Sequence, residues 1–348
     1  MVATSIESFD ENQERDDNEP MLRLGFPVQP HIQNTLFPSN FLVANNRVLE
    51  QILRDRSRDS ILRGSTLELH YQTIEGFVGL DRKDKIDVRS IVNRLKRRGY
   101  QFMIHHPFLR QKGEGPFNMD FVWHTVPAQY RSDDGQEGVP VTHIMDKLIY
   151  AEEVRLDLSK RFLEYCDFLG VRNVTIHVTK PGTVLAEEDF KDYSAKIGEL
   201  VTYIQRQGLD VAIAVETGGI TPNQLLRLNA DHGTYINLDV AHFFLDLDTA
   251  HPGKFYQKKR RDVVDFFRDY REIIPQLHLT ETHSGDQHLP IHEKGILNPC
   301  NQSILQIMQD DLRNGKTYLA MVESEYNPRD AAYIRQVLSD PRITPLQD

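Results

Sequence analysis

Residues 278–295, HLTETHSGDQHLPIHEKG, concentrate histidines and carboxylates directly after a short apolar strand pattern. Imidazole nitrogens and carboxylate oxygens are the side-chain donors that bind zinc and related divalent metals. Asp286 and His288 are two residues apart, so in an extended loop both side chains project to the same side and can bind one ion. His278 precedes them on the strand. The stretch therefore predicts metal ligands at a strand end and in the loop that follows it.

Other strand patterns in the chain also end in ionisable residues. Side chains on a strand alternate between two faces, and residues 173–179 place Val174 and Ile176 on one face and Thr175 and His177 on the other. The corresponding polar faces of other strands carry Glu68, His70, His105, Glu216, Asp239 and His278. Any one of these groups could simply be buried and hydrogen-bonded. Together, however, unpaired carboxylates would repel one another, so we expect bound cations to compensate their charge.

The elements that position these residues alternate between strand and helix. Expected strands are 22–26, 66–71, 100–105, 173–179, 211–216, 235–240, 276–280 and 318–323. Expected helices include 40–57, 86–98, 143–169, 187–207, 261–273, 302–314 and 329–338, with a short one near 222–228. This alternation predicts an α/β fold, a (β/α)8 TIM barrel whose apolar strand faces pack on the helices and whose polar faces point at the axis. An open doubly wound sheet is the alternative, but ETGG at 216–219 lacks the GxGxxG spacing.

Length and composition favour a single domain with an acidic tail. The chain has 348 residues, 39% of them apolar, and a net charge of −10. Residues 1–20 are acidic and poor in large apolar groups, so we expect a solvated tail before a barrel domain at 21–348. The glycine-rich stretch 107–142 is expected to be an insertion after the third strand, over the rim of the barrel.

The sequence also indicates where the protein acts. No segment reaches the ~20 apolar residues of a membrane-spanning helix, and the start of the chain lacks a signal-peptide pattern. Cys166 and Cys300 are far apart and show no CxxC spacing, which fits a reducing compartment and excludes a cysteine-built metal site. We therefore expect a soluble, cytoplasmic protein without a membrane partner, while the sequence gives no indication of its oligomeric state.

The motifs HHPF, TIHVTKPG, VETGG, LDVAH, LHL, DQH and MVESE resemble those of the xylose isomerase-like TIM-barrel superfamily, and within it of the endonuclease IV family. That resemblance implies a centre of three zinc ions with Glu216 as a bridging ligand; Mn, Fe or Co also suit mixed His and carboxylate ligation. The implied metal ligands are His105, His177, Glu216, Asp239, His242, His278, Asp286, His288 and Glu323. The chain departs from the family in the loops around these residues, for example in LDVAHFFLD and DQHLPIHEKG.

The favoured hypothesis is phosphoester hydrolysis by metal-activated water, with Glu216 and Glu323 as catalytic residues. The basic segment KFYQKKRR at 254–261 lies where loops gather at the top of a barrel, so Lys258 and Lys259 are candidate substrate contacts, although such a charge run is also typical of a solvated helix start. The substrate would be a small phosphorylated compound or damaged DNA, and the net negative charge and altered loops argue against DNA.

Two alternatives remain open at this point. A sugar or sugar-phosphate isomerase or epimerase would need one metal ion, held chiefly by Glu216, Asp239, His278 and Glu323, with Glu216 and Glu323 carrying protons. Its polyhydroxylated substrate would then contact the following residues: Arg23, Glu68 and His70. A barrel that only binds a ligand or partner is the third hypothesis, and it leaves the many buried acids and imidazoles without a use.

Overall fold

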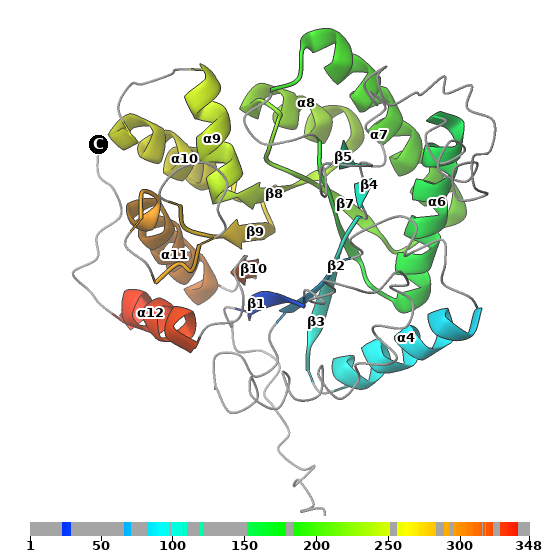
Figure 1. The fold of residues 1–348 in the computed structure, drawn as a ribbon, viewed down its shortest axis with the longest axis horizontal. Coiled ribbons are helices and arrows are strands. Elements are labelled where there is room, and N and C mark those ends of the chain that lie inside the picture. Colours follow the sequence, from blue (N-terminus) through cyan, green and yellow to red (C-terminus); the bar gives the residue numbers. More distant parts are fainter. Residues whose placement is uncertain are drawn as a thin grey trace, which may run out of the picture.

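The strands of the computed structural model form a curled parallel sheet that closes into a barrel (Figure 1). The structure describes residues 23–28, 66–70, 82–97, 99–106, 108–109, 119–120, 152–178, 184–250, 256–282, 289–292, 295–314, 316, 318–322 and 328–339. The barrel strands are β1 (Arg23–Val28), β2 (Thr66–His70), β3 (Gln101–His105), β6 (Asn173–Ile176), β7 (Ala212–Glu216), β8 (Tyr235–Asp239), β9 (Gln276–Leu279) and β10 (Leu319–Val322). Their order around the barrel is β1-β10-β9-β8-β7-β6-β3-β2, and β1 also pairs with β2. Each predicted strand is therefore present within a few residues of its expected bounds.

Helices surround this sheet (Figure 1). They are α4 (Arg82–Lys96), α6 (Glu152–Leu169), α7 (Glu187–Gln207), α8 (Pro222–His232), α9 (Val240–Ala250), α10 (Tyr256–Tyr270), α11 (Asn298–Arg313) and α12 (Pro328–Ser339). Helix α7 has the predicted bounds, and α8 is longer than the short segment expected there. The predicted helix 40–57 and the first part of the predicted helix 143–169 lie outside the described residues.

Helix α9 was not predicted from the sequence. It begins at Val240, directly after the last residue of β8, without an intervening turn residue. No glycine or proline marks this boundary, and its start signal is Asp239, an N-cap residue type that is also the last residue of the strand. As a consequence the basic segment 254–261 follows a helix rather than a strand, and most of it forms the first turns of α10.

The start of α8 shows why the chain turns sharply after β7. Thr221 caps the helix by accepting a hydrogen bond from the backbone N–H of Gln224, and the Gln224 side chain accepts one from the backbone N–H of Thr221. Proline at the first helical position has no N–H to leave unsatisfied. In the turn before it, Gly218 and Gly219 have φ angles of 144° and 74°, which residues with a Cβ rarely adopt.

The core divides as the alternation of strand side chains predicts. The apolar faces of the strands, among them Val174, Ile213, Leu238 and Leu277, belong to one large buried cluster with the helices. A separate small cluster contains Met103, Leu319 and Met321. Met103 lies on the opposite face of β3 from Phe102 and Ile104, so we place this small cluster inside the barrel.

The predicted domain boundaries are only partly covered by the described residues. The predicted acidic tail, 1–20, lies outside them. Within the predicted insertion 107–142 the structure describes one antiparallel pair, β4 (Phe108–Leu109) and β5 (Met119–Asp120). None of the helices in the described part of the chain is long and apolar enough to cross a membrane.

Candidate metal centre

Six of the predicted metal ligands gather at the carboxyl ends of neighbouring strands. His105 ends β3, Glu216 ends β7, Asp239 ends β8, and His278 lies in β9. The remaining two are His177, directly after β6, and His242, in the first turn of α9. All six side chains are buried. Residues distant in sequence are brought together because parallel strands of a barrel end at one mouth.

Glu216 lies at the centre of the cluster. Its Oε2 atom is 3.1 Å from His177 Nε2 and 3.4 Å from His105 Nε2. Its Oε1 atom is 3.1 Å from His242 Nδ1 and 3.5 Å from His278 Nδ1. Each carboxylate oxygen therefore faces a different pair of imidazoles, as a carboxylate that bridges two cations would.

Asp239 lies on the same side as the second pair of imidazoles. Its Oδ2 atom is 3.8 Å from His242 Nδ1 and 3.9 Å from His278 Nδ1. Its Oδ1 atom accepts a 2.7 Å hydrogen bond from the backbone N–H of His242, which fixes the first turn of α9 against the strand end. The carboxylate thus both orders the helix start and offers an oxygen to the cluster.

The described residues contain two groups that can hold a metal ion, and both include Glu216. One group is His105, His177 and Glu216, and the other is Glu216, Asp239 and His242. Within each group one donor atom per residue lies within 4.8 Å of the others. Nitrogen and carboxylate oxygen donors without thiolates fit zinc and the other borderline divalent metals, so this donor set suits such an ion.

The electrostatics of the cluster favour the protonation states that bind metal. Burial alone would raise the pKa of Glu216, but the charges of His177 and His278 and hydrogen bonds from His105 and His177 hold it well below its ordinary value. Burial lowers the pKa of His177, against the opposing effect of Glu216. The lowered pKa of Glu216 favours the ionised carboxylate and the lowered pKa of His177 favours the neutral ring, and these are the forms in which the two side chains bind a metal.

A polar layer that the sequence analysis did not single out lies next to the cluster. Asn237, on the inward face of β8, donates a 3.2 Å hydrogen bond from Nδ2 to Glu216 Oε2, and the same atom lies 3.0 Å from His278 Nε2. Thr175 and Gln276 lie beside it and are hydrogen-bonded to each other at 3.0 Å. All three are buried. Their signal was available, because each stands two residues before a predicted ligand and so shares its strand face.

The turn between β7 and α8 packs against the other side of the cluster. A Cβ added to Gly218 would lie 3.3 Å from His242 Nδ1, so the backbone of the turn closely approaches that imidazole. Asp246, one helical turn after His242 on α9, accepts hydrogen bonds from the backbone N–H groups of Gly219 at 2.8 Å and Ile220 at 3.4 Å. Glycine at 218 and the Asp246 carboxylate together fix this turn.

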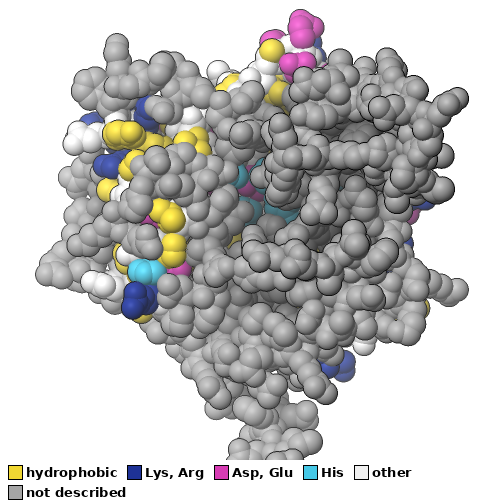
Figure 2. Space-filling view, in the orientation of Figure 1, with side chains coloured by type: hydrophobic (Ala, Val, Ile, Leu, Met, Phe, Trp, Pro, Cys, Tyr) yellow, Lys and Arg dark blue, Asp and Glu magenta, His cyan; other side chains and the backbone are white. Residues whose placement is uncertain are grey.

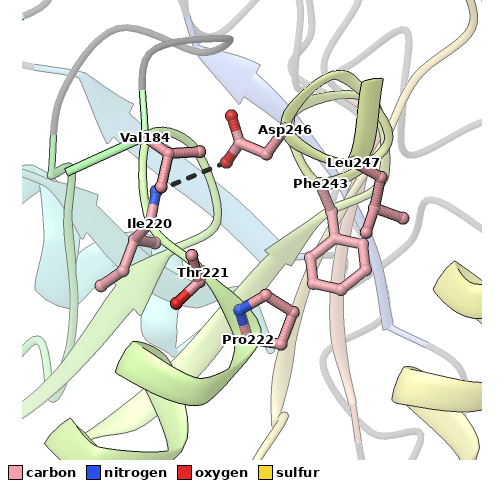
Figure 3. Close-up of a pocket in the computed structure, with 7 residues that line it drawn as sticks. All are labelled: Val184, Ile220, Thr221, Pro222, Phe243, Asp246 and Leu247. Carbon is pink, nitrogen blue, oxygen red and sulfur yellow. Dashed lines mark hydrogen bonds between the residues drawn. The ribbon is translucent and has the colours of Figure 1, made fainter. Parts of the chain in front are cut away.

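Beside this turn lies a pocket of about 410 Å³ (Figure 3). Its walls come from the segment before α7, the start of α8 and one side of α9, and they consist of Val184, Ile220, Thr221, Pro222, Phe243, Asp246 and Leu247. Figure 3 shows the Asp246 carboxylate at its edge, directed at the backbone nitrogen of Ile220. Most of the lining is apolar, and none of the six clustered acids and imidazoles belongs to it.

The space-filling view shows one face of the molecule. Histidine and acidic side chains are visible inside a recess near the middle of this face (Figure 2).

The other predicted site residues lie elsewhere or outside the described part of the chain. Asp286, His288 and Glu323 belong to the segments that the structure does not describe. Among the strand residues, the backbone of His70 pairs with that of His105, and Glu68 pairs with Met103. Arg23 begins β1 and pairs with Leu319, the first residue of β10, so its backbone lies at the end of the barrel opposite to the cluster.

The two predicted lysines make contacts within the protein. Lys258 is exposed and forms an ion pair with Asp262 at 2.8 Å. Lys259 is buried, and its ammonium group lies 5.8 Å and 5.7 Å from the ring centroids of Phe244 and Tyr256, which stack on each other. Burial lowers the pKa of Lys259. Its contact with these rings belongs to the packing of α10 on α9, which the sequence reading did not foresee because it lacked α9.

Comparison with known proteins shows likeness at the level of structure. No family model matches the chain, and no curated protein sequence matches it either. A D-tagatose 3-epimerase-like protein is similar with a TM-score of 0.54 and 14% identity over 91% of this chain and 96% of that one. Endonuclease IV from Thermus thermophilus is similar with a TM-score of 0.52 and 16% identity over 91% and 97%.

A xylose isomerase domain protein from Planctomyces limnophilus gives a TM-score of 0.50 and 14% identity over 93% of this chain and 97% of that one. Identities this low establish the fold alone. The structures that this chain resembles are xylose isomerase-like TIM-barrel proteins, and they include both endonuclease IV and sugar epimerases, as the motifs predicted.

Proposed function

We propose that this protein is a divalent-metal-dependent enzyme that hydrolyses a phosphoester bond. The observation that carries the proposal is the arrangement around Glu216, whose two oxygens face different imidazole pairs. One metal ion needs about three protein ligands and an open position, whereas six donor residues converge here. The surplus favours a centre with more than one cation.

The protein supplies the geometry of this centre. Divalent ions bound there would neutralise a phosphate group and make a water molecule a stronger nucleophile near neutral pH. Glu216 would hold two cations, while His105 and His177 complete one position and Asp239 and His278 complete the other. The buried site excludes bulk water, which strengthens every charge interaction inside it.

The proposal includes residues that lie outside the described part of the chain. Asp286 and His288 would complete a third position with His242, and Glu323 would be a ligand and second catalytic carboxylate beside Glu216. The full chain would then be a single-domain (β/α)8 TIM barrel with 107–142 as an insertion and up to three zinc ions, with Mn, Fe or Co as substitutes. The two cysteines are free and buried, in keeping with the expected cytoplasmic location.

The substrate follows from charge and size. The net charge of −10 opposes sequence-independent binding of long polyanions, and Lys259 is packed on rings of its own chain. We therefore propose a small phosphorylated compound as the substrate, with damaged DNA as the alternative that the likeness to endonuclease IV supports.

A second candidate function is the epimerisation or isomerisation of a sugar or sugar phosphate. The likeness to a D-tagatose 3-epimerase-like protein favours it. Glu216, Asp239, His278 and Glu323 would hold one metal ion, and the two glutamates would move the proton between neighbouring carbons of the substrate. Under this function His105, His177 and His242 would be surplus to the metal, which is the argument against it.

Metal analysis of protein purified without added ions distinguishes the two candidates. About three bound metal ions per protein chain, or at least two, would support the hydrolase. A single metal ion per chain would favour the epimerase. The loaded protein should then be assayed on a synthetic phosphodiester, on a duplex with one abasic site, and on a panel of ketoses. Epimerised sugar together with intact phosphodiesters would overturn the first proposal.

Substitution of the central carboxylate tests the site directly. Glu216→Gln keeps the side-chain shape but removes the charge shared by both groups, so we expect loss of activity and of bound metal without unfolding. Glu199→Gln is the charge-matched control, because Glu199 is half exposed and pairs with Lys160 on the outside of the barrel. A Glu216→Gln protein with normal turnover would remove Glu216 from the mechanism.

A further inference from the structure

Asn237 occupies a position next to the cluster that no ligand pattern predicts. It lies on β8 two residues before Asp239, and the register pairs its backbone with those of Glu216 on β7 and Gln276 on β9. Its side chain is completely buried. An amide has no charge to offer a cation, so its presence at this place calls for a different explanation from that of the ligands.

The contacts of the amide join the two halves of the cluster. Its Nδ2 atom donates to Glu216 Oε2, the oxygen that faces His105 and His177, at 3.2 Å. The same atom is 3.0 Å from His278 Nε2, whereas the Nδ1 atom of that ring faces Glu216 and Asp239. The amide therefore restrains the shared carboxylate, and it also contacts the edge of the His278 ring that faces away from the acids.

Behind the amide lies a hydrogen-bonded pair of buried side chains, Thr175 and Gln276. Asn237 Nδ2 lies 3.5 Å from Thr175 Oγ1, and that hydroxyl donates a 3.0 Å hydrogen bond to Gln276 Oε1. These residues come from β8, β6 and β9, so the layer spans the inside of the barrel beneath the cluster. A buried hydrogen-bonded pair below the amide leaves it little room to move away from Glu216.

We propose that Asn237 is a positioning residue of the metal centre, which sets the orientation of the Glu216 carboxylate as a metal ligand. The inference rests on the proposed function only in requiring that the cluster binds metal; it holds for either reaction. Groups hydrogen-bonded to metal ligands fix the direction of the donor atom, and their loss typically costs about ten- to hundredfold in metal affinity.

Two substitutions of Asn237 test this role. Asn237→Ala removes the amide and leaves space, while Asn237→Leu keeps the volume and removes only the polar contacts. Asn301 provides the matched control: it is also completely buried and donates one 2.9 Å hydrogen bond, from Nδ2 to the backbone oxygen of Thr280. Asn301→Ala and Asn301→Leu thus remove a buried amide whose hydrogen bond goes to a backbone oxygen and to none of the six clustered side chains.

Titration of the metal-free proteins with Co²⁺, followed by its visible absorption, gives the readout without any substrate. We expect both Asn237 variants to bind Co²⁺ about ten- to hundredfold more weakly than the wild type and with altered band shapes, because the ligand directions change. The Asn301 variants should bind within roughly twofold of the wild type despite a comparable loss of thermal stability.

The outcomes separate this inference from the proposed function. Asn237→Leu protein that binds Co²⁺ with wild-type affinity and spectrum would overturn the positioning role while leaving the metal centre intact. Equal weakening in the Asn301 variants would overturn it too, since the effect would then be one of stability. Wild-type protein that binds no Co²⁺ would overturn the metal centre itself.

Discussion

Asp246 offers the sharpest test of how the site is built, because it is the side chain that fixes the turn after Glu216. Its carboxylate is nearly buried and accepts hydrogen bonds from the backbone N–H groups of Gly219 and Ile220. Asp246→Ala would leave these donors without that acceptor in a turn already made of positive φ angles. The turn would then lose the contact that holds it to α9.

The magnitude follows from the two bonds. The 2.8 Å bond to Gly219 is short and has a charged acceptor, and the 3.4 Å bond to Ile220 is long and contributes little. Hydrogen bonds to charged groups contribute about 1.5–3 kcal/mol, and an unsatisfied buried donor adds its desolvation cost, so we expect Asp246→Ala to destabilise the fold by about 2–4 kcal/mol. Asp246→Asn keeps an oxygen acceptor and should cost about half as much.

Urea unfolding followed by circular dichroism measures the change, and hydrogen exchange at Gly219 and Ile220 localises it. Asp262→Ala is the control, because it removes an aspartate whose ion pair with Lys258 is exposed, and such pairs contribute about 0.5 kcal/mol or less. If Asp246→Ala changes the free energy of unfolding no more than Asp262→Ala does, the turn is held by something other than this carboxylate.

Three further predictions concern metal, glycine and cysteine. Chelation of bound metal should lower the midpoint of thermal unfolding, since ligand at about a hundred times its Kd stabilises by about 2.7 kcal/mol; an unchanged midpoint in calorimetry would contradict a bound cation. Gly295→Ala should destabilise by about 1–3 kcal/mol in urea unfolding, because its Cβ would lie 2.5 Å from the buried Glu281 carboxylate, whereas Gly208→Ala meets no atom within 4 Å and suffers only its positive φ. Burial raises the pKa of the Cys300 thiol to about 12 from 9.0, so the unfolded chain releases this proton first and stability falls as pH rises above 9, by about 1.4 kcal/mol at pH 10 from this group. Cys300→Ala should remove that part of the slope between pH 8 and 10, and an unchanged slope would refute its origin.

The barrel could be predicted because the sequence shows two periodicities, the two-residue alternation of strands and the 3.6-residue repeat of helices. In strands such as 173–176 the β-branched residues Val174 and Ile176 alternate with Thr175, and the structure buries the apolar face against the helices. Helix α7 could be placed to the residue, since three acidic residues begin it and Gly208 ends it in the left-handed conformation. Local rules sufficed where each boundary had its own signal.

Helix α9 escaped prediction because its start signal, the N-cap residue Asp239, is also the last residue of a strand. Val240 continues the alternation of Ile236 and Leu238 in β8, and the backbone N–H of His242 bonds to the Asp239 carboxylate, which caps the helix. This contact depends on the rotamer of a side chain that the sequence marks equally well as a metal ligand. The sequence analysis therefore identified Asp239 and His242 as candidate ligands but did not predict helix α9, which begins directly after Asp239.

The polar layer beneath the cluster, which consists of Asn237, Thr175 and Gln276, could be predicted only in part from the sequence. Alternation predicted that Asn237 and Thr175 face inward, but not that one amide would touch Glu216 and His278 together, because that depends on the relative register of β7, β8 and β9. The register places Asn237 opposite Glu216 while Asp239 lies opposite His278. A shift of one residue would turn the ligands of that strand to the outside of the barrel, so the apolar face that fixes the register also determines which acids and imidazoles can share a cation.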